Sequence, residues 1–294
     1  MLRELRQFFN KSPLLVLFIG INLVVFLLIN FLRLIFFLWD MPHHADVMTA
    51  WIGISSNPGL IVSRPWTAFT YMFLHFGFFH IFFNMLVLYV GGRLFSDFIG
   101  NKQLSVTYLL GGLTGALFFV LAYNFFPVFE EVKHQAVAIG ASASVLAIFI
   151  AVTVYAPDYR LPLILLGPVK LKYIAIFFVI IDILSIERGN PGGHIAHLGG
   201  AFWGLIYGLM VRARIDPAKK IGLWVGSIAR RFSPKSRLKV KYSSTRPLTD
   251  EDYNFQRSER QKEIDRILDK ISHSGYESLS AKEKEMLFKM GNKP

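Results

Sequence analysis

Long apolar runs are the feature that most limits what this chain can fold into. The first, residues 13–39, contains a single charged residue, Arg33. About 20 consecutive apolar residues span the hydrocarbon core of a bilayer, whereas the core of a signal peptide is about 7–15 residues long. The run is too long and too bulky for a signal peptide, so we predict an uncleaved transmembrane helix.

Further apolar runs predict a bundle of membrane-spanning helices. They cover residues 68–90, 104–126, 136–155, 171–186 and 194–211. The span at 171–186 is short and could begin earlier, because residues 161–169 are also apolar, although Pro162 and Pro168 interrupt them. The predicted fold is all-α: a polytopic membrane protein with six transmembrane helices in a bundle.

The composition supports a membrane protein and argues against a nucleic-acid partner. The chain is 53% hydrophobic and 18% charged, whereas soluble domains are about 45–50% apolar and about 25% charged. The net charge is +12, but residues 212–294 hold 20 Lys+Arg against 11 Asp+Glu, which assigns +9 to the tail. With no cysteine in the chain, disulfide scaffolds and thiolate metal or redox sites are excluded.

The distribution of cations predicts the orientation. With the N-terminus inside, the inner flanks of the spans carry eight cations: Arg3, Arg6, Lys11, Arg93, Lys102, Arg160, Lys170 and Lys172. The outer flanks carry Arg64, Lys133 and Arg188. Because cytoplasmic flanks are enriched in Lys and Arg, we expect both termini in the cytoplasm, and we expect the membrane to be the plasma (inner) membrane.

The tail predicts two further parts beyond a transmembrane domain at 1–211. Residues 212–258 form a basic stalk and linker that could bind anionic lipid headgroups. Residues 259–294 form a helical hairpin. Its first helix has an apolar stripe at Ile264, Ile267, Leu268 and Ile271, and Ser280 with Glu283 forms a capping box for the second. The stripe fits partner binding and self-packing equally well.

Polar side chains inside the predicted spans are candidates for a functional site, because they are costly in a bilayer. Ser142 lies near the start of its span, behind Gly140. A serine in such a helix more often bonds its own backbone. A helix N-terminus, however, presents free N–H groups and a partial positive charge that would stabilise an oxyanion.

Two other spans supply the partners that a serine nucleophile needs. His197 begins its helix at a depth like that of Ser142 and could act as the general base. His80 and Asn84 are four residues apart and share a helix face, from which both can donate hydrogen bonds to an oxyanion. The alternative is a buried polar pair that ties helices together.

These segments together resemble the rhomboid family of intramembrane serine proteases. The resemblance is carried by FLHFGFFHIFFN at 73–84, GASAS at 140–144 and HLGGAFWG at 197–204, supported by the glycine-rich span YLLGGLTGALF. It covers residues 60–211 well, and the first span by position only. Each motif is weak alone, but their order and spacing make the match specific.

The resemblance implies peptide hydrolysis inside the membrane, on single-span transmembrane substrates and without a cofactor or metal. It makes Ser142 the nucleophile and His197 its base, a dyad without a required carboxylate. His80, Asn84 and the Ser142 backbone N–H form the oxyanion hole, and His75 is a structural polar residue.

The resemblance also places residues 40–66 against the outer leaflet, with Trp51 and Trp66 at headgroup depth. Four positions differ from the family pattern. Thr67 follows Trp66 where the family has an Arg, Phe95 stands where an acidic residue is often found, and the other two lie near Ser142. Ala143 stands where the family has Gly after the nucleophile. Leu146 stands where a Tyr packs on the catalytic histidine.

Several alternatives stay open. His194 could compete with His197 as base, whereas Ser144 is expected to face away from Ser142. Asp182 could tie helices together or, less often in such a position, orient a histidine. A histidine metal site, a transporter and a catalytically inactive rhomboid-like chaperone or binding protein are less favoured, since Ser142 and His197 are both present.

Overall fold

The computed structural model describes residues 12–163, 166–219 and 249–291. The chain divides into two compact units, Met1–Ser233 and Pro234–Pro294, and each is treated by itself. Arg3, Arg6 and Lys11, together with the stalk and linker residues 220–248, lie outside the described residues. The predicted domain boundaries at 211 and 258 stay predictions.

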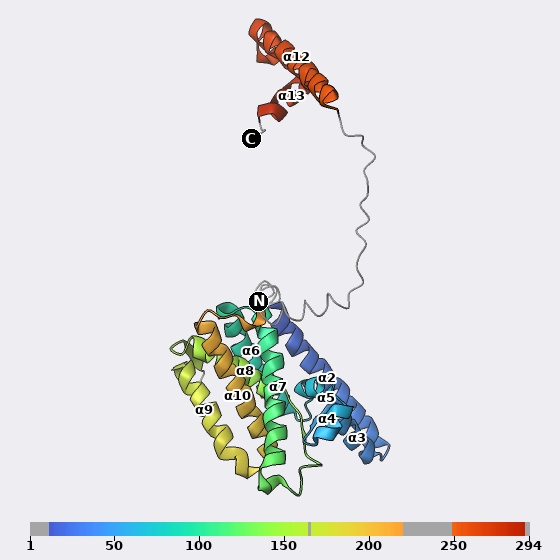
Figure 1. Ribbon diagram of the computed structural model, residues 1–294, viewed down its shortest axis with the longest axis vertical. Coiled ribbons are helices and arrows are strands. Elements are labelled where there is room, and N and C mark those ends of the chain that lie inside the picture. The colour runs from blue at the N-terminus through green and yellow to red at the C-terminus, as the bar shows by residue number, and fades with distance from the viewer. Residues whose placement is uncertain (1–11, 164–165, 220–248, 292–294) are drawn as a thin grey trace. The chain divides into compact units, whose positions relative to one another are not determined.

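The first unit is mostly helical (Figure 1). Its α-helices are α2 (Pro13–Leu38), α3 (Pro42–Ile52), α4 (Pro58–Ser63), α5 (Thr67–Thr70), α6 (Phe78–Phe98), α7 (Asn101–Phe125), α8 (Ser142–Tyr155), α9 (Leu171–Ser185) and α10 (Pro191–Arg212). Short 3-10 turns are η1 (Tyr71–Phe73), η2 (Pro127–Phe129) and η3 (Ile186–Arg188).

Helix α8 is the centre of this unit. Every residue from 143 to 153 is buried, and α8 packs against α6, α7 and α10. A helix that is apolar all round must be covered on every side, so the chain surrounds α8 with neighbours. Helix α9 packs mainly on α10, and α2 packs on α6 and α7 at the edge of the bundle.

Small residues let α8 and α10 approach backbone to backbone. A Cβ added to Gly200 would collide with the carbonyl oxygen of Ala143, and one added to Gly204 would collide with that of Ala147. Glycines at positions four apart form a continuous stripe along one helix face, which is the usual way for membrane helices to pack closely. This contact fixes the depth of α10 relative to α8.

Four of the described helices, α2, α6, α7 and α10, are long and apolar enough to cross a membrane. Helix α8 has 14 residues and α9 has 15. At 1.5 Å per residue, 14 residues extend only about 21 Å, against about 30 Å for the hydrocarbon core. The count of six spans therefore stays a prediction.

The second predicted span, 68–90, is wrong in its bounds. Helix α6 begins at Phe78 and ends at Phe98, because residues 67–73 form short turns and Gly77 is extended. The residues on both sides of this break are apolar, so composition alone could not show where α6 begins. As a consequence, His75 lies in the connection before α6 and not within the span.

Two small antiparallel ribbons depart from the all-α prediction. Strand β1 (Ile54–Ser55) pairs with β2 (Val137–Ala138), and β3 (Arg160–Leu163) pairs with β4 (Gly167–Lys170). The second ribbon places Pro162 opposite Pro168. It occupies the apolar residues before α9, which excludes an earlier start for that span, since α9 begins at Leu171.

The loop between α2 and α6 carries the two predicted interfacial tryptophans. Trp51 and Trp66 stack with ring centroids 6.0 Å apart, and the Trp66 indole N–H donates to the Trp51 carbonyl. The Arg64 guanidinium lies 4.1 Å above the Trp51 ring. Both rings are about half exposed, as expected of side chains with an apolar body and a polar edge.

The second unit is a helical hairpin of α12 (Asp250–Ser274), η4 (Tyr276–Ser278) and α13 (Ala281–Gly291). Helix α12 begins within the predicted linker, because Thr249 and Asp252 form a capping box. Ile267 is buried, whereas Leu268 is half exposed. The Lys270 ammonium bonds the Glu283 carboxylate across the turn. Because Ile267 is buried within this hairpin, the apolar stripe is used in part for self-packing.

We expect Gly200→Ala to destabilise the helical bundle. The new methyl group would meet the backbone of Ala143, which cannot move without displacing α8. Overpacking of this kind costs about 1–3 kcal/mol. Thermal unfolding in detergent measures the effect. Gly20→Ala is the matched control, because a Cβ at Gly20 meets no atom within 4 Å. Equal melting temperatures for the two variants would contradict the packing described here.

The tail hairpin is expected to weaken at low pH. The Ser280 backbone N–H and hydroxyl, with the Lys270 ammonium, lower the pKa of Glu283 to about 2. The stability that this carboxylate contributes is present above its ordinary pKa, near 4.5, and is lost as the pH falls through about 2. Carbon-13 NMR of labelled Glu side chains in the intact chain measures the midpoint. Ser280→Ala should raise it, and an unchanged midpoint would rule out this capping interaction.

Candidate functional site

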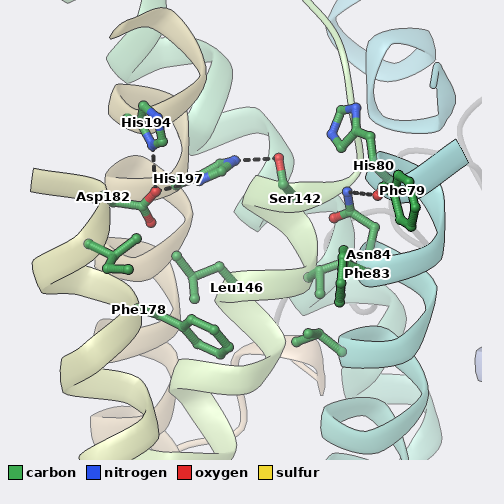
Figure 2. A pocket seen from close by; sticks show the side chains of 13 residues that line it. Phe79, His80, Phe83, Asn84, Ser142, Leu146, Phe178, Asp182, His194 and His197 are labelled. Atoms are coloured by element: carbon green, nitrogen blue, oxygen red, sulfur yellow. Dashed lines mark hydrogen bonds and ion pairs between the residues drawn. The ribbon is translucent and has the colours of Figure 1, made fainter. Parts of the chain in front are cut away.

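A cavity of about 460 Å³ lies between α6, α8, α9 and α10 (Figure 2). It brings together all four residues predicted for the site: Ser142, His197, His80 and Asn84. Two more polar residues, Asp182 and His194, line it. The rest of the lining is apolar: Phe79, Phe83, Val87, Val145, Leu146, Phe178 and Ile181. Phe83 and Ile181 are also exposed, so the cavity borders the apolar surface of α6 and α9.

Ser142 is the first residue of α8. Gly140 precedes it at a φ of +122°, a conformation that L side chains rarely adopt, and the Gly140 N–H donates to the Tyr71 carbonyl. The N-cap residue, Ala141, provides no side-chain cap. The backbone N–H groups of the first turn therefore remain available beside the Ser142 hydroxyl.

The second hydroxyl of the motif lies elsewhere. Ser144 is buried, does not line the cavity, and faces Gly112 of α7. Its position agrees with the expectation that a residue two further along a helix faces away.

Ser142 and His197 are in hydrogen-bond contact. The Ser142 Oγ lies 2.6 Å from the His197 Nε2, although the two residues are 55 apart in sequence. His197 lies three residues before Gly200 and about two helical turns before Gly204, so the close α8–α10 contact sets its depth. This is the distance and order expected of a nucleophile and its general base.

A carboxylate lies behind the histidine. The Asp182 Oδ1 is 2.7 Å from the His197 Nδ1 and 2.8 Å from the His194 Nδ1. Figure 2 shows the continuous line of contacts from Ser142 through His197 and Asp182 to His194. Asp182 of α9 therefore contacts two histidines of α10. Among the described residues, His197 contacts Ser142, whereas the contact found for the His194 Nδ1 is with Asp182.

His80 and Asn84 face Ser142 across the cavity, from the first turns of α6. The Asn84 Nδ2 donates to the His80 carbonyl at 2.9 Å. Because an amide carries two hydrogens, the second remains for a ligand. A Cβ placed on Gly140 would lie 3.0 Å from the His80 Cε1, so only glycine leaves room for this ring beside the serine.

His75 is a buried residue that contacts both His80 and the segment before Ser142. It is fully buried, and its ring meets that of His80 edge-on with centroids 4.8 Å apart. Its Nε2 accepts from the Ala141 N–H at 3.4 Å, and Asn30 of α2 donates to its carbonyl. These contacts suit the structural role expected of it.

Asp182, His194 and His197 are also a group, within the described parts of the chain, whose ligand atoms lie close enough to hold a metal ion, all within 4.8 Å of one another. The metal site weighed from the sequence contained histidines alone. Asp182 was considered separately, as a lone acid in an apolar span that could tie helices together or orient a histidine, and its place between His194 and His197 was not predicted. The hydrogen bonds among these side chains account for their separation.

Comparison with known proteins identifies two family matches along the chain. A family model described as "Rhomboid domain" matches residues 62–214, and a "Family of unknown function (DUF6576)" matches residues 249–292. Curated relatives carry the name presenilin-associated rhomboid-like protein, mitochondrial, or its A form. The Homo sapiens protein is 28% identical over 184 residues, which are 59% of this chain and 44% of the relative.

The corresponding protein of Mus musculus is 29% identical over 59% of this chain and 45% of the relative. The Danio rerio protein is 29% identical over 46% of this chain and 34% of the relative. The chain therefore spans less than half of the length of these relatives. The rhomboid match covers more than half of this chain, from α4 through the end of α10. The chain is a multi-pass membrane protein and belongs to the rhomboid family.

Proposed function

We propose that the chain is an intramembrane serine endopeptidase in which Ser142 is the nucleophile and His197 the general base. The observation that carries the proposal is the 2.6 Å contact between the Ser142 Oγ and the His197 Nε2. It lies at an uncapped helix N-terminus inside a mostly apolar cavity. A hydroxyl in such a place is activated by the base and faces donors for the charge that develops.

The reaction follows from these positions. The Ser142 Oγ attacks the carbonyl carbon of the scissile peptide while the His197 Nε2 takes its proton. The oxyanion that forms accepts hydrogen bonds from the Ser142 backbone N–H, the free Asn84 amide hydrogen and His80. His197 then gives its proton to the leaving amine, and water releases the acyl group by the same steps.

The substrates that fit are single-span transmembrane proteins. Exposed Phe83 and Ile181 line the cavity, so a helix in the bilayer could reach it from the side of α6 and α9. A helical peptide shields its own carbonyls, so the substrate has to unwind locally before attack. Small or helix-breaking residues near the cut favour this step.

The orientation and the membrane belong to the same proposal. The excess of cations on the predicted inner flanks supports cytoplasmic termini, with the site near the outer face. We propose the plasma membrane, with anionic lipid headgroups near the basic tail. The names of the curated relatives place those proteins in mitochondria.

Ser142→Ala should abolish cleavage, by more than about 10³-fold in kcat, because no other group can form the acyl-enzyme. Purified protein in liposomes, with a single-span substrate, gives the rate, and a fluorophosphonate probe should label wild type at Ser142. Ser144→Ala is the matched control and should keep wild-type activity, since Ser144 lies outside the cavity. Equal cleavage by wild type and Ser142→Ala would refute the proposal. Binding of transmembrane segments without cleavage or labelling would instead favour a catalytically inactive rhomboid-like chaperone.

His197→Ala should lose activity to the same extent as Ser142→Ala, because the base and the nucleophile act as a unit. His194→Ala should lose less than about tenfold, since its ring contacts Asp182 and not Ser142. Single-turnover cleavage of the same substrate compares the two. The reverse order of activities would make His194 the base.

A further inference from the structure

We infer that Asp182 is a positioning residue that converts the proposed serine–histidine dyad into a Ser142–His197–Asp182 triad. This inference rests on the proposed function and adds a third group to it. The resemblance to the family implies a dyad that requires no carboxylate. In this chain, the carboxylate oxygen lies 2.7 Å from the ring nitrogen of His197 that faces away from the serine.

The contact decides which nitrogen of His197 carries the proton. An ionised carboxylate only accepts hydrogen bonds, so the Nδ1 that faces Asp182 must donate. A neutral imidazole has one N–H, which leaves the Nε2 with a free lone pair. That nitrogen lies 2.6 Å from the Ser142 Oγ and is ready to accept its proton. Asp182 thus selects the tautomer that can act as a base.

Asp182 is also placed to stabilise the product of proton transfer. When the His197 Nε2 takes the serine proton, the ring becomes a cation. The Asp182 side chain is only 8% exposed, so little solvent screens the attraction between the two charges. The carboxylate keeps its charge and no second proton moves.

His194 completes the surroundings of this carboxylate. It lies three residues before His197 on α10, on the same helix face, and its Nδ1 is 2.8 Å from the same Oδ1. A buried carboxylate is costly unless it accepts hydrogen bonds, and two ring N–H donors meet that need. Both donors come from α10, whereas the acid comes from α9.

Leu146, which lines the same cavity as His197, cannot select the tautomer of that histidine, whereas Asp182 can. Leu146 stands at the position where the family resemblance expects an aromatic ring against the histidine, and it provides no polar group. An aliphatic side chain can restrict a ring by packing but cannot choose between its tautomers. A directed hydrogen bond does both.

Two other roles for Asp182 make different predictions. A residue that only ties α9 to α10 would change stability and leave the His197 tautomer unaffected. A metal ligand would make activity depend on a divalent ion, since Asp182, His194 and His197 could hold one. The experiment has to separate these roles from positioning.

The test compares Asp182→Asn, Asp182→Glu, Ser142→Ala and wild type in liposomes. For Asp182→Asn we expect kcat to fall at least about a hundredfold, with KM changed less than about threefold, because the amide neither holds the imidazolium nor selects the tautomer. Asp182→Glu keeps the acceptor and should recover at least about a tenth of the lost activity. Ile183→Asn, which places the same amide on an exposed neighbouring side chain of α9 outside the cavity, is the matched control.

Nitrogen-15 NMR of labelled histidine gives a reading that does not depend on turnover. In wild type, His197 should be protonated at Nδ1 and unprotonated at Nε2, and in Asp182→Asn this preference should be lost. The inference is overturned if wild-type His197 carries its proton on Nε2, if Asp182→Asn keeps wild-type kcat, or if a chelator abolishes wild-type activity. If Asp182→Asn does not fold, the tautomer of His197 in wild type and the cleavage rate of Asp182→Glu still test the inference.

Failure of the proposed function would look different. In that case wild type itself would neither cleave nor react with the fluorophosphonate. Loss of this inference alone would leave wild type active and Ser142→Ala inactive, with Asp182→Asn as fast as wild type.

Discussion

The close contact between α8 and α10 is the constraint on which the site depends. Gly200 and Gly204 leave no space for a side chain against the backbone of Ala143 and Ala147. Since Ala143 follows Ser142 directly, and His197 lies three residues before Gly200, the same contact sets the serine and the histidine at one depth. Packing of small residues, which needs no polar group, thereby aligns the two polar groups that carry the proposed chemistry.

Six polar side chains of the bundle gather around the Ser142 end of α8. His75, His80 and Asn84 approach the Ser142 end of α8 from one side, and His194, His197 and Asp182 approach it from the other. Each of these groups would be costly in a bilayer if left unpaired. Gathering them around one helix N-terminus satisfies most of them by mutual hydrogen bonds and leaves the outer faces of α2 and α9 apolar.

The sequence predicted the helices whose apolar runs end at polar or glycine-rich segments, such as α7 and α9, and it named the four residues that the cavity joins. It misplaced the start of α6, since residues 67–77 are as apolar as the helix that follows. It could not anticipate the β1–β2 ribbon, because pairing of two-residue strands depends on distant backbone geometry. For Asp182 the sequence left two roles open, and its contact with two histidines depends on the register of α9 against α10, which the sequence does not contain.

The β1–β2 ribbon has a consequence for the biosynthesis of the protein. Ile54 pairs with Ala138 just before the Gly140 turn, so the segment that leads into Ser142 is anchored to a loop made much earlier. His197 and Asp182 follow later still, on the last two helices of the bundle. A chain emerging from the ribosome therefore inserts most of its bundle before the serine acquires its base. The nascent protein therefore passes through the insertion machinery, among other unfolded membrane segments, before the proposed catalytic centre has formed.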